Sequence, residues 1–120
     1  MSSPEAPLPA GAACERTYQV LVDGEEKPVL CRWLIPEPHP KNGWRCEGQI
    51  VWPDGRVRSM AIGGEDSLQA LRLAMMFVAT ELLTASEPVY LSAIDDDLDL
   101  PLPDVLADLV AERKARFEAR

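Results

Sequence analysis

Two short turn sequences, Asp23-Gly24 and Pro53-Asp54-Gly55, constrain the fold of this chain most strongly. An aspartate-glycine pair favours a tight hairpin, and proline before aspartate and glycine presets the first dihedral angle of a turn. Parallel strands need a crossover of about a dozen residues or more, so strands joined by such turns run antiparallel. The sequence therefore predicts an antiparallel sheet built from hairpins.

Alternation of apolar and polar side chains predicts the strands that these turns join. Apolar residues recur at every second position in four runs, which is the period of a half-buried strand. A fifth short strand or extended segment is expected at 89–94, and the prolines around His39 place that residue in a loop. The four predicted strands, which form a meander, span residues 17–22, 28–35, 43–52 and 57–62.

A long helix is predicted from Asp66 to about Thr84. Asp66 can cap the amide three residues on, while Gln69 reaches back to the helix start. Apolar residues at helical spacing form its main stripe: Leu68, Leu71, Met75, Val78, Ala79 and Leu82. Further apolar residues lie off that stripe: Leu73, Met76, Phe77 and Leu83. We expect this helix to be buried between the sheet and the C-terminal segment; the alternative is that its surplus face binds a partner.

The two ends of the chain differ in character. Residues 1–15 are rich in proline, alanine and serine without hydrophobic periodicity, which predicts a flexible tail. A last helix is expected to start near Pro103, because proline suits the first helical position. Residues 16–120 are thus predicted to form one α+β domain, with a four- to five-stranded antiparallel sheet, a central helix and a C-terminal helix.

The charge of the chain is distributed unevenly. The net charge is −8, yet the stretch from Leu73 to Glu112 holds nine acids and no Lys or Arg, which leaves +1 for the remainder. An acidic balance argues against general nucleic-acid binding, and no apolar run approaches the ~18 residues of a membrane span. Without a basic, apolar signal sequence, we expect a cytoplasmic protein.

The three cysteines do not predict a metal centre. Cys31, His39 and Cys46 have spacings unlike those of a zinc site, and an odd cysteine count argues against a disulfide framework. Cys31 and Cys46 lie in predicted strands, where free cysteines act as small apolar core residues. No metal ligand and no cofactor is predicted.

The aspartates from Asp95 to Asp99 are the strongest candidate for a functional cluster. Their spacing matches the opening of a calcium-binding loop, but Leu100 and Leu106 occupy the positions that require glycine and glutamate. The chain has no phosphate-binding loop and no nucleophile motif, so we expect no enzymatic activity and no catalytic residue. Clustered negative charge instead favours association with a basic partner.

The segment Gly64-Glu65-Asp66-Ser67-Leu68-Gln69-Ala70-Leu71-Arg72-Leu73-Ala74, after a Trp-rich β region, resembles the signature of a bacterial family of uncharacterised small domains. The signature reads G-x-D-S-x-Q-A-L-x-L-A, and the acidic, proline-punctuated stretch from Asp95 to Pro103 also resembles members of that family. The match covers about Thr17 to Leu109. The resemblance implies no particular activity, although some small acidic domains with a similar layout are immunity proteins.

These features predict a non-enzymatic protein-binding module, for example an immunity protein that neutralises a basic toxin through an acidic surface. The alternatives are a small-ligand or divalent-cation site at the same aspartates, and a homo-oligomer that uses the surplus helix face. Trp44, Trp52 and Tyr90 could anchor a partner, because aromatic residues often dominate interfaces. The predicted partner-binding residues are Asp95, Asp96, Asp97, Asp99 and Tyr90.

Overall fold

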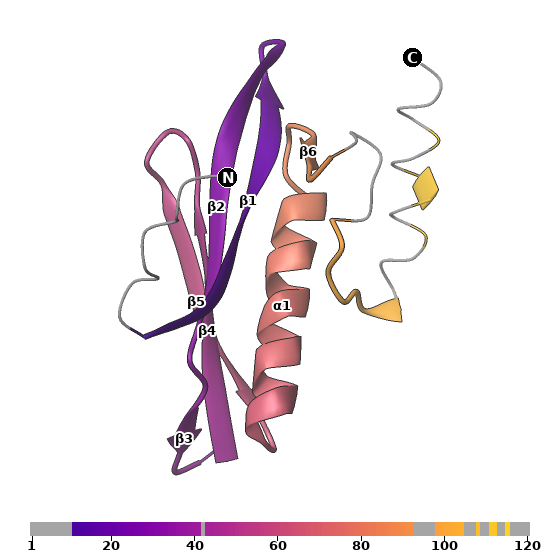
Figure 1. The fold of residues 1–120 in the computed structure, drawn as a ribbon. Helices are drawn as coiled ribbons and strands as arrows, with labels where there is room; N and C mark the ends of the chain where they lie inside the picture. The colour runs from indigo at the N-terminus through magenta and orange to yellow at the C-terminus, as the bar shows by residue number, and fades with distance from the viewer. Residues whose placement is uncertain are drawn as a thin grey trace.

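The computed structural model describes residues 11–41, 43–92, 98–104, 108, 111–112 and 115. These residues form an α+β fold in which one long helix, α1, packs on one face of an antiparallel sheet (Figure 1). The elements are β1 (Ala12–Val22), β2 (Glu25–Leu34), β3 (Glu37–His39), β4 (Gly43–Val51), β5 (Val57–Gly64), α1 (Ser67–Leu83) and β6 (Val89–Tyr90).

The predicted meander is present, and two short strands extend it. β1, β2, β4 and β5 pair in that order, while β6 joins the free side of β1 and β3 pairs with the start of β4. The sheet therefore has six strands rather than four or five. The loop predicted around His39 was wrong, because Glu37–His39 forms β3. Pro38 is accommodated there because β3 is short and pairs only with β4.

β1 and β2 begin earlier than alternation alone predicted, whereas β4 and β5 begin where they were predicted. β1 starts at Ala12 and pairs with β2 from Ala12 opposite Leu34 onward, so residues 12–15 belong to the sheet rather than to the predicted tail. A bulge between Ala12 and Cys14 explains why the alternation is hard to see at this point in the sequence. Residues 1–10 lie outside the described residues.

The predicted helix start is confirmed. Asp66 is the N-cap, and its Oδ1 accepts a hydrogen bond from the Gln69 backbone N–H at 2.7 Å. The Gln69 side chain in turn accepts from the Glu65 backbone N–H at 2.6 Å. The first bond satisfies an amide that the first helical turn leaves unpaired, and the second ties the residue before the N-cap to the same turn, so this local sequence determines where α1 begins.

Small residues set the distance between α1 and the sheet. A Cβ atom added at Gly64 would lie 2.5 Å from the Ala70 nitrogen, and one at Gly48 would lie 3.2 Å from a methyl group of Val78. The helix face that touches the sheet therefore includes the fully buried Ala70 and Ala74. This close approach is why α1 and β4 can share one dense core.

The predicted apolar stripe of α1 is correct along most of its length but wrong at its start. Val78, Ala79 and Leu82 are buried, whereas Leu68 is 73% exposed. Leu68 lies one residue after the helix begins, where the sheet-facing position is taken by Ala70 instead. Cys31 and Cys46 are buried in the core, as predicted.

The segment after β6 contributes to the same core. Leu98 is fully buried, and Leu100 and Leu102 pack against the core cluster. Residues 98–104 run along α1 in Figure 1, which agrees with a helix buried between the sheet and the C-terminal segment. The helix predicted from Pro103 falls mostly on residues outside the described ones.

Candidate functional site

The structure describes two of the five residues that the sequence grouped as a partner-binding site. Asp95, Asp96 and Asp97 lie outside the described residues, so a cation site or a partner site there stays a prediction. Asp99 and Tyr90 are described, and both are tied to the sheet. Among the described residues, no three His, Cys, Asp or Glu side chains are grouped so that they could hold a metal ion.

Asp99 lies in a turn that is fastened to β1. Its side chain is 78% exposed, and Oδ2 lies 3.5 Å from Nη2 of Arg16. Arg16 also donates to the Asp99 carbonyl at 3.0 Å, while the hydroxyl of Tyr18 donates to the Leu98 carbonyl at 2.7 Å. Leu98 and Asp99 have φ angles of 68° and 51°, a conformation unfavourable for side-chain-bearing residues. The buried Leu98 side chain and these bonds hold the turn in place.

Tyr90 has little surface to offer a partner. It pairs with Gln19 of β1 and is 8% exposed. Its hydroxyl donates a hydrogen bond to the carboxylate of Glu26, and this bond raises the pKa of Tyr90 to about 12. Tyr90 therefore acts first as a brace between β6 and β2.

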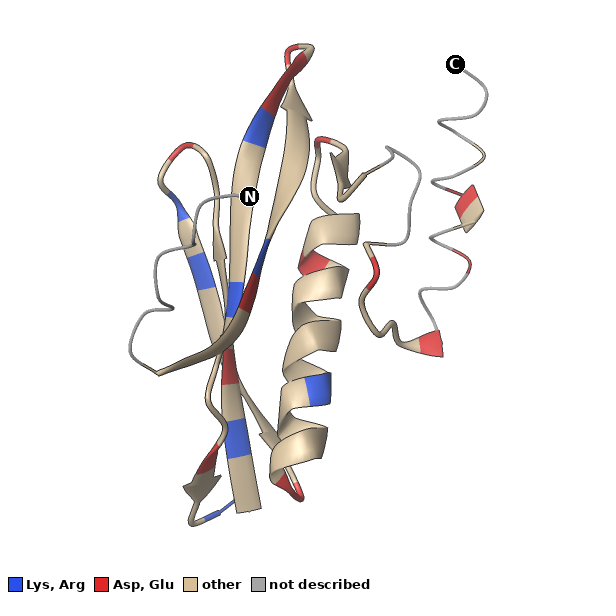
Figure 2. Ribbon diagram, viewed as in Figure 1, with Lys and Arg blue, Asp and Glu red and all other residues tan. Residues whose placement is uncertain are grey.

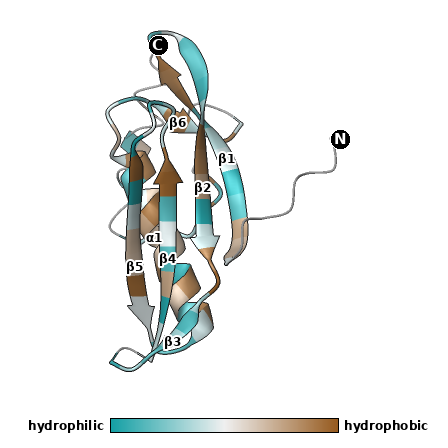
Figure 3. Ribbon diagram, turned by 90° about the vertical axis from the view of Figure 1, so that its left-hand side faces the viewer, coloured by the Kyte–Doolittle hydropathy of each residue, from teal (hydrophilic) through white to brown (hydrophobic). Residues whose placement is uncertain are grey.

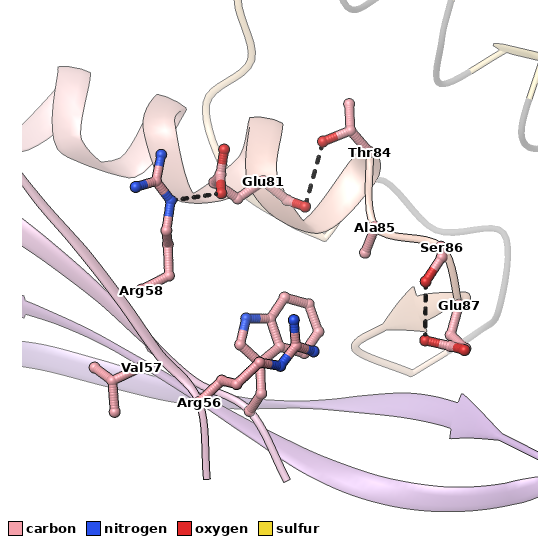
Figure 4. Close-up of a pocket in the computed structure, with 9 residues that line it drawn as sticks. Arg56, Val57, Arg58, Glu81, Thr84, Ala85, Ser86 and Glu87 are labelled. Carbon is pink, nitrogen blue, oxygen red and sulfur yellow. Dashed lines mark hydrogen bonds and ion pairs between the residues drawn. The ribbon is translucent and has the colours of Figure 1, made fainter. Parts of the chain in front are cut away.

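A pocket lies near the opposite edge of the sheet, between the start of β5 and the end of α1 (Figure 4). Its volume is about 460 Å³, within the range of small-ligand and side-chain sites. We call it the Trp52 pocket. Its lining combines one indole ring with charged groups and hydroxyls: Trp52, Arg56, Val57, Arg58, Glu81, Thr84, Ala85, Ser86 and Glu87.

The turn between β4 and β5 positions the Trp52 side of this pocket. Trp52 and Gly55 close the turn, since the Gly55 amide donates to the Trp52 carbonyl at 3.0 Å and the Trp52 amide donates to the Arg56 carbonyl at 2.9 Å. Gly55 has a φ of 94°, which a residue with a side chain rarely adopts. Asp54 accepts from Nε of Arg56 at 2.8 Å, and the Arg56 guanidinium lies 5.5 Å from the Trp52 ring centroid.

The end of α1 and the loop after it form the opposite wall. Arg58 of β5 donates through Nε to Glu81 of α1 at 2.9 Å and lies over the ring of Phe77. Beyond the helix, Ser86 donates to Glu87, and the next residue is held because the Leu21 amide donates to the Pro88 carbonyl at 3.0 Å. Glu87 is thus carried on a loop that is bonded to β1.

A second hollow of about 280 Å³ continues from this pocket toward β1 and β2. The two hollows share Trp52, Arg56 and Glu87, and the second adds Lys27 of β2. In Figure 1 the hairpin of β1 and β2 and the hairpin of β4 and β5 diverge toward this end of the sheet. The shared residues therefore lie in a groove between two hairpins.

The Trp52 pocket presents both hydrogen-bond donors and negative charge. Both arginines use Nε for a carboxylate, Arg56 with Asp54 and Arg58 with Glu81. Among the described residues their Nη groups have no hydrogen-bond partner, and Glu87 accepts only from the Ser86 hydroxyl. The pocket thus offers hydrogen-bond donors on one wall and an uncompensated carboxylate on the other.

The sequence identified only part of this site. Trp52 was considered as an anchor, and Glu81 and Glu87 were counted among the nine acids. Arg56 and Arg58 were missed, because two arginines after a turn carry no motif by themselves. Their role depends on α1 ending beside β5, which is a tertiary arrangement.

Fold and site together define a small α+β domain with a groove at one end of its sheet. Residues 14–101 match a family model described as a domain of unknown function (DUF6968), and the chain belongs to that family. The match runs from β1 to just past the Leu98–Asp99 turn, so it includes both regions described above. No curated protein and no solved structure matches this chain. The helix-start signature and the bacterial origin stay predictions.

Among the described residues, no helix has the length and apolar character needed to cross a membrane.

Proposed function

We propose that this domain is a non-enzymatic protein-binding module for a partner with a basic surface. The observation that carries the proposal is the Trp52 pocket, in which an arginine stacked on a tryptophan lies beside paired and unpaired carboxylates. Tryptophan and arginine are the residues most enriched at the energetic centres of protein interfaces. The immunity-protein hypothesis is one case of such a module and stays a prediction.

The charge distribution supports a basic partner. From Leu73 to Glu112 the sequence holds nine acids and no Lys or Arg, whereas the basic residues among the described ones lie mainly on the strands (Figure 2). An acidic stretch of this kind would raise the association rate with a basic protein and select against acidic ones. The aspartates from Asp95 to Asp99 would add to this steering.

The test begins with the tagged full chain, used to isolate partners from its native cell, followed by binding of each purified partner in solution. Glu87→Lys should weaken binding about tenfold or more, because it reverses the unpaired charge of the pocket. Glu112→Lys, which makes the same change in net charge at an exposed site elsewhere, is the matched control and should have a smaller effect. Equal effects of both variants would contradict a site at the pocket.

The steering contribution has a separate test. Replacing Asp95, Asp96, Asp97 and Asp99 by lysine should slow association with the same partner and flatten its salt dependence, while dissociation changes little. Unchanged association rates would show that the acidic stretch does not guide the partner.

A further inference from the structure

The outer side of β5 carries backbone groups without partners among the described residues. In an antiparallel pair, residues that exchange hydrogen bonds alternate with residues whose backbone groups point away. Trp52 and Arg56 form the bonded pair next to the turn, and the register from Val57 to Ile62 is regular. The N–H and C=O groups that point away from β4 are therefore those of Val57, Ser59 and Ala61.

This edge lacks the usual protection. Exposed edge strands are commonly short, bulged, interrupted by proline or heavily charged, which prevents pairing with other chains. β5 has eight residues, no proline and one charged side chain, and no bulge interrupts its register between Val57 and Ile62. Figure 3 shows β5 at one margin of the sheet with no strand beyond it.

The Trp52 pocket opens directly beside this edge. Val57 and Arg58 of β5 line the pocket, and Arg58 reaches Glu81 across to α1. A strand added to β5 would place every second side chain on the helix side of the sheet. One of those side chains would then face the pocket.

The Glu87 wall of the pocket favours a cation at that position. Glu87 is exposed and has no basic partner among the described residues, and the last turn of α1 contains no basic residue. A helix C-terminus carries a partial negative charge that favours cations. The two arginines of the pocket are already balanced by Asp54 and Glu81.

From this geometry we propose that the partner binds as an extended segment that adds a strand to the edge of β5 and inserts a Lys or Arg side chain into the Trp52 pocket. The inference rests on the proposed function and specifies its binding mode. In this mode main-chain hydrogen bonds supply affinity, and the pocket supplies specificity.

The experiment uses displayed random peptides of about 12 residues, a length that spans an exposed strand, selected on the full chain. Selected peptides should carry a Lys or Arg within a β-favouring run, and Glu87→Lys should weaken their binding about tenfold. Ser59→Pro removes the central outward N–H and should weaken binding about tenfold or more, whereas Ser59→Ala should leave it within about twofold. Failure to enrich any such peptide would overturn the inference.

Backbone-methylated peptides keep the test decisive if Ser59→Pro fails to fold. On the wild-type chain, N-methylation of the peptide amides that point toward β5 should abolish binding. N-methylation of the alternate amides, which point away from β5, should be tolerated. Binding insensitive to methylation would overturn strand addition, while the proposed function would survive if Glu87→Lys still weakened binding. A stable dimer of the free chain in light scattering would instead assign the edge to a second copy.

Discussion

The two edges of the sheet differ in the length of the last strand and in the contacts that hold it. At one edge, β6 is two residues long, pairs with β1, and is braced by the hydrogen bond between Tyr90 and Glu26. At the other edge, β5 runs for eight residues beside a pocket and has no strand beyond it among the described residues. The first edge resists further pairing, and the second is available for it.

Under the proposed function, the β6 side would serve stability and the β5 side would serve recognition. On the β6 side, polar groups form hydrogen bonds within the chain, since Tyr18 and Arg16 donate to the Leu98–Asp99 turn. The β5 side leaves donors, acceptors and one carboxylate unsatisfied by the described residues. Sites that bind partners need such groups to be free, because buried and paired groups gain little from a partner.

The largest expected effect comes from proline on β5. Met60→Pro removes an amide that points toward Gly48 of β4 and should destabilise the fold by about 3 kcal/mol or more. Ser59→Pro removes an amide that points away from β4 and should cost less than about 1 kcal/mol. Chemical denaturation of both variants measures the difference. Equal losses of stability would contradict the assignment of the Met60 amide to the β4 side and of the Ser59 amide to the outer side of β5.

Gly64, where α1 meets the end of β5, should give the next largest effect. Gly64→Ala places a methyl group against the backbone of Ala70 and should cost about 3 kcal/mol, because neither backbone can yield easily. Gly24→Ala is the control: its φ is 79° but the space around it is open, so the cost should be about 1 kcal/mol. Thermal denaturation measures both losses of stability. A larger loss for Gly24→Ala than for Gly64→Ala would contradict this packing.

The two tyrosines of the chain both lie on the β6 side, and they predict an alkaline transition. Burial raises the pKa of Tyr18 to about 12, and the bond to Glu26 raises that of Tyr90 to about 12, from an ordinary value of 10.0. A raised pKa means that the folded state holds the proton more tightly. Its stabilisation is complete below pH 10 and is lost as the pH rises toward 12. Tyrosinate absorbance should show no midpoint near 10 in the folded protein; a normal midpoint would contradict both environments.

The smallest effect is expected at the ion pair of the open side. Arg58→Ala removes the pair with Glu81, whose side chains are 46% and 32% exposed, and should cost less than about 1 kcal/mol. Denaturation at low and high salt measures this. A loss of several kcal/mol would mean that Arg58 supports the fold rather than the pocket.

The fold was largely predictable because its signals are local. The turns at Asp23-Gly24 and at Pro53, and the Asp66–Gln69 cap, are determined by neighbouring residues. The miss at Leu68 has a tertiary cause, since Ala70 and glycines of the sheet set the contact face. β3 was missed because proline signals a loop but is also tolerated in an edge strand.

The site was less predictable than the fold. Net charge pointed to the aspartates from Asp95 onward, yet Asp99 is held by Arg16 and Tyr90 is nearly buried. The Trp52 pocket arises only when the end of α1 reaches the start of β5. No spacing along the chain encodes that meeting.

Amide hydrogen exchange along β5, followed by NMR, tests the central claim most directly. In the free chain the amides of Val57, Ser59 and Ala61 should exchange fast, while those of Arg58 and Met60 are protected by β4. A selected basic peptide at saturation should slow exchange at the first three positions. Uniform protection along β5 in the free chain, or fast exchange that persists with peptide bound, would contradict an open edge that receives a strand.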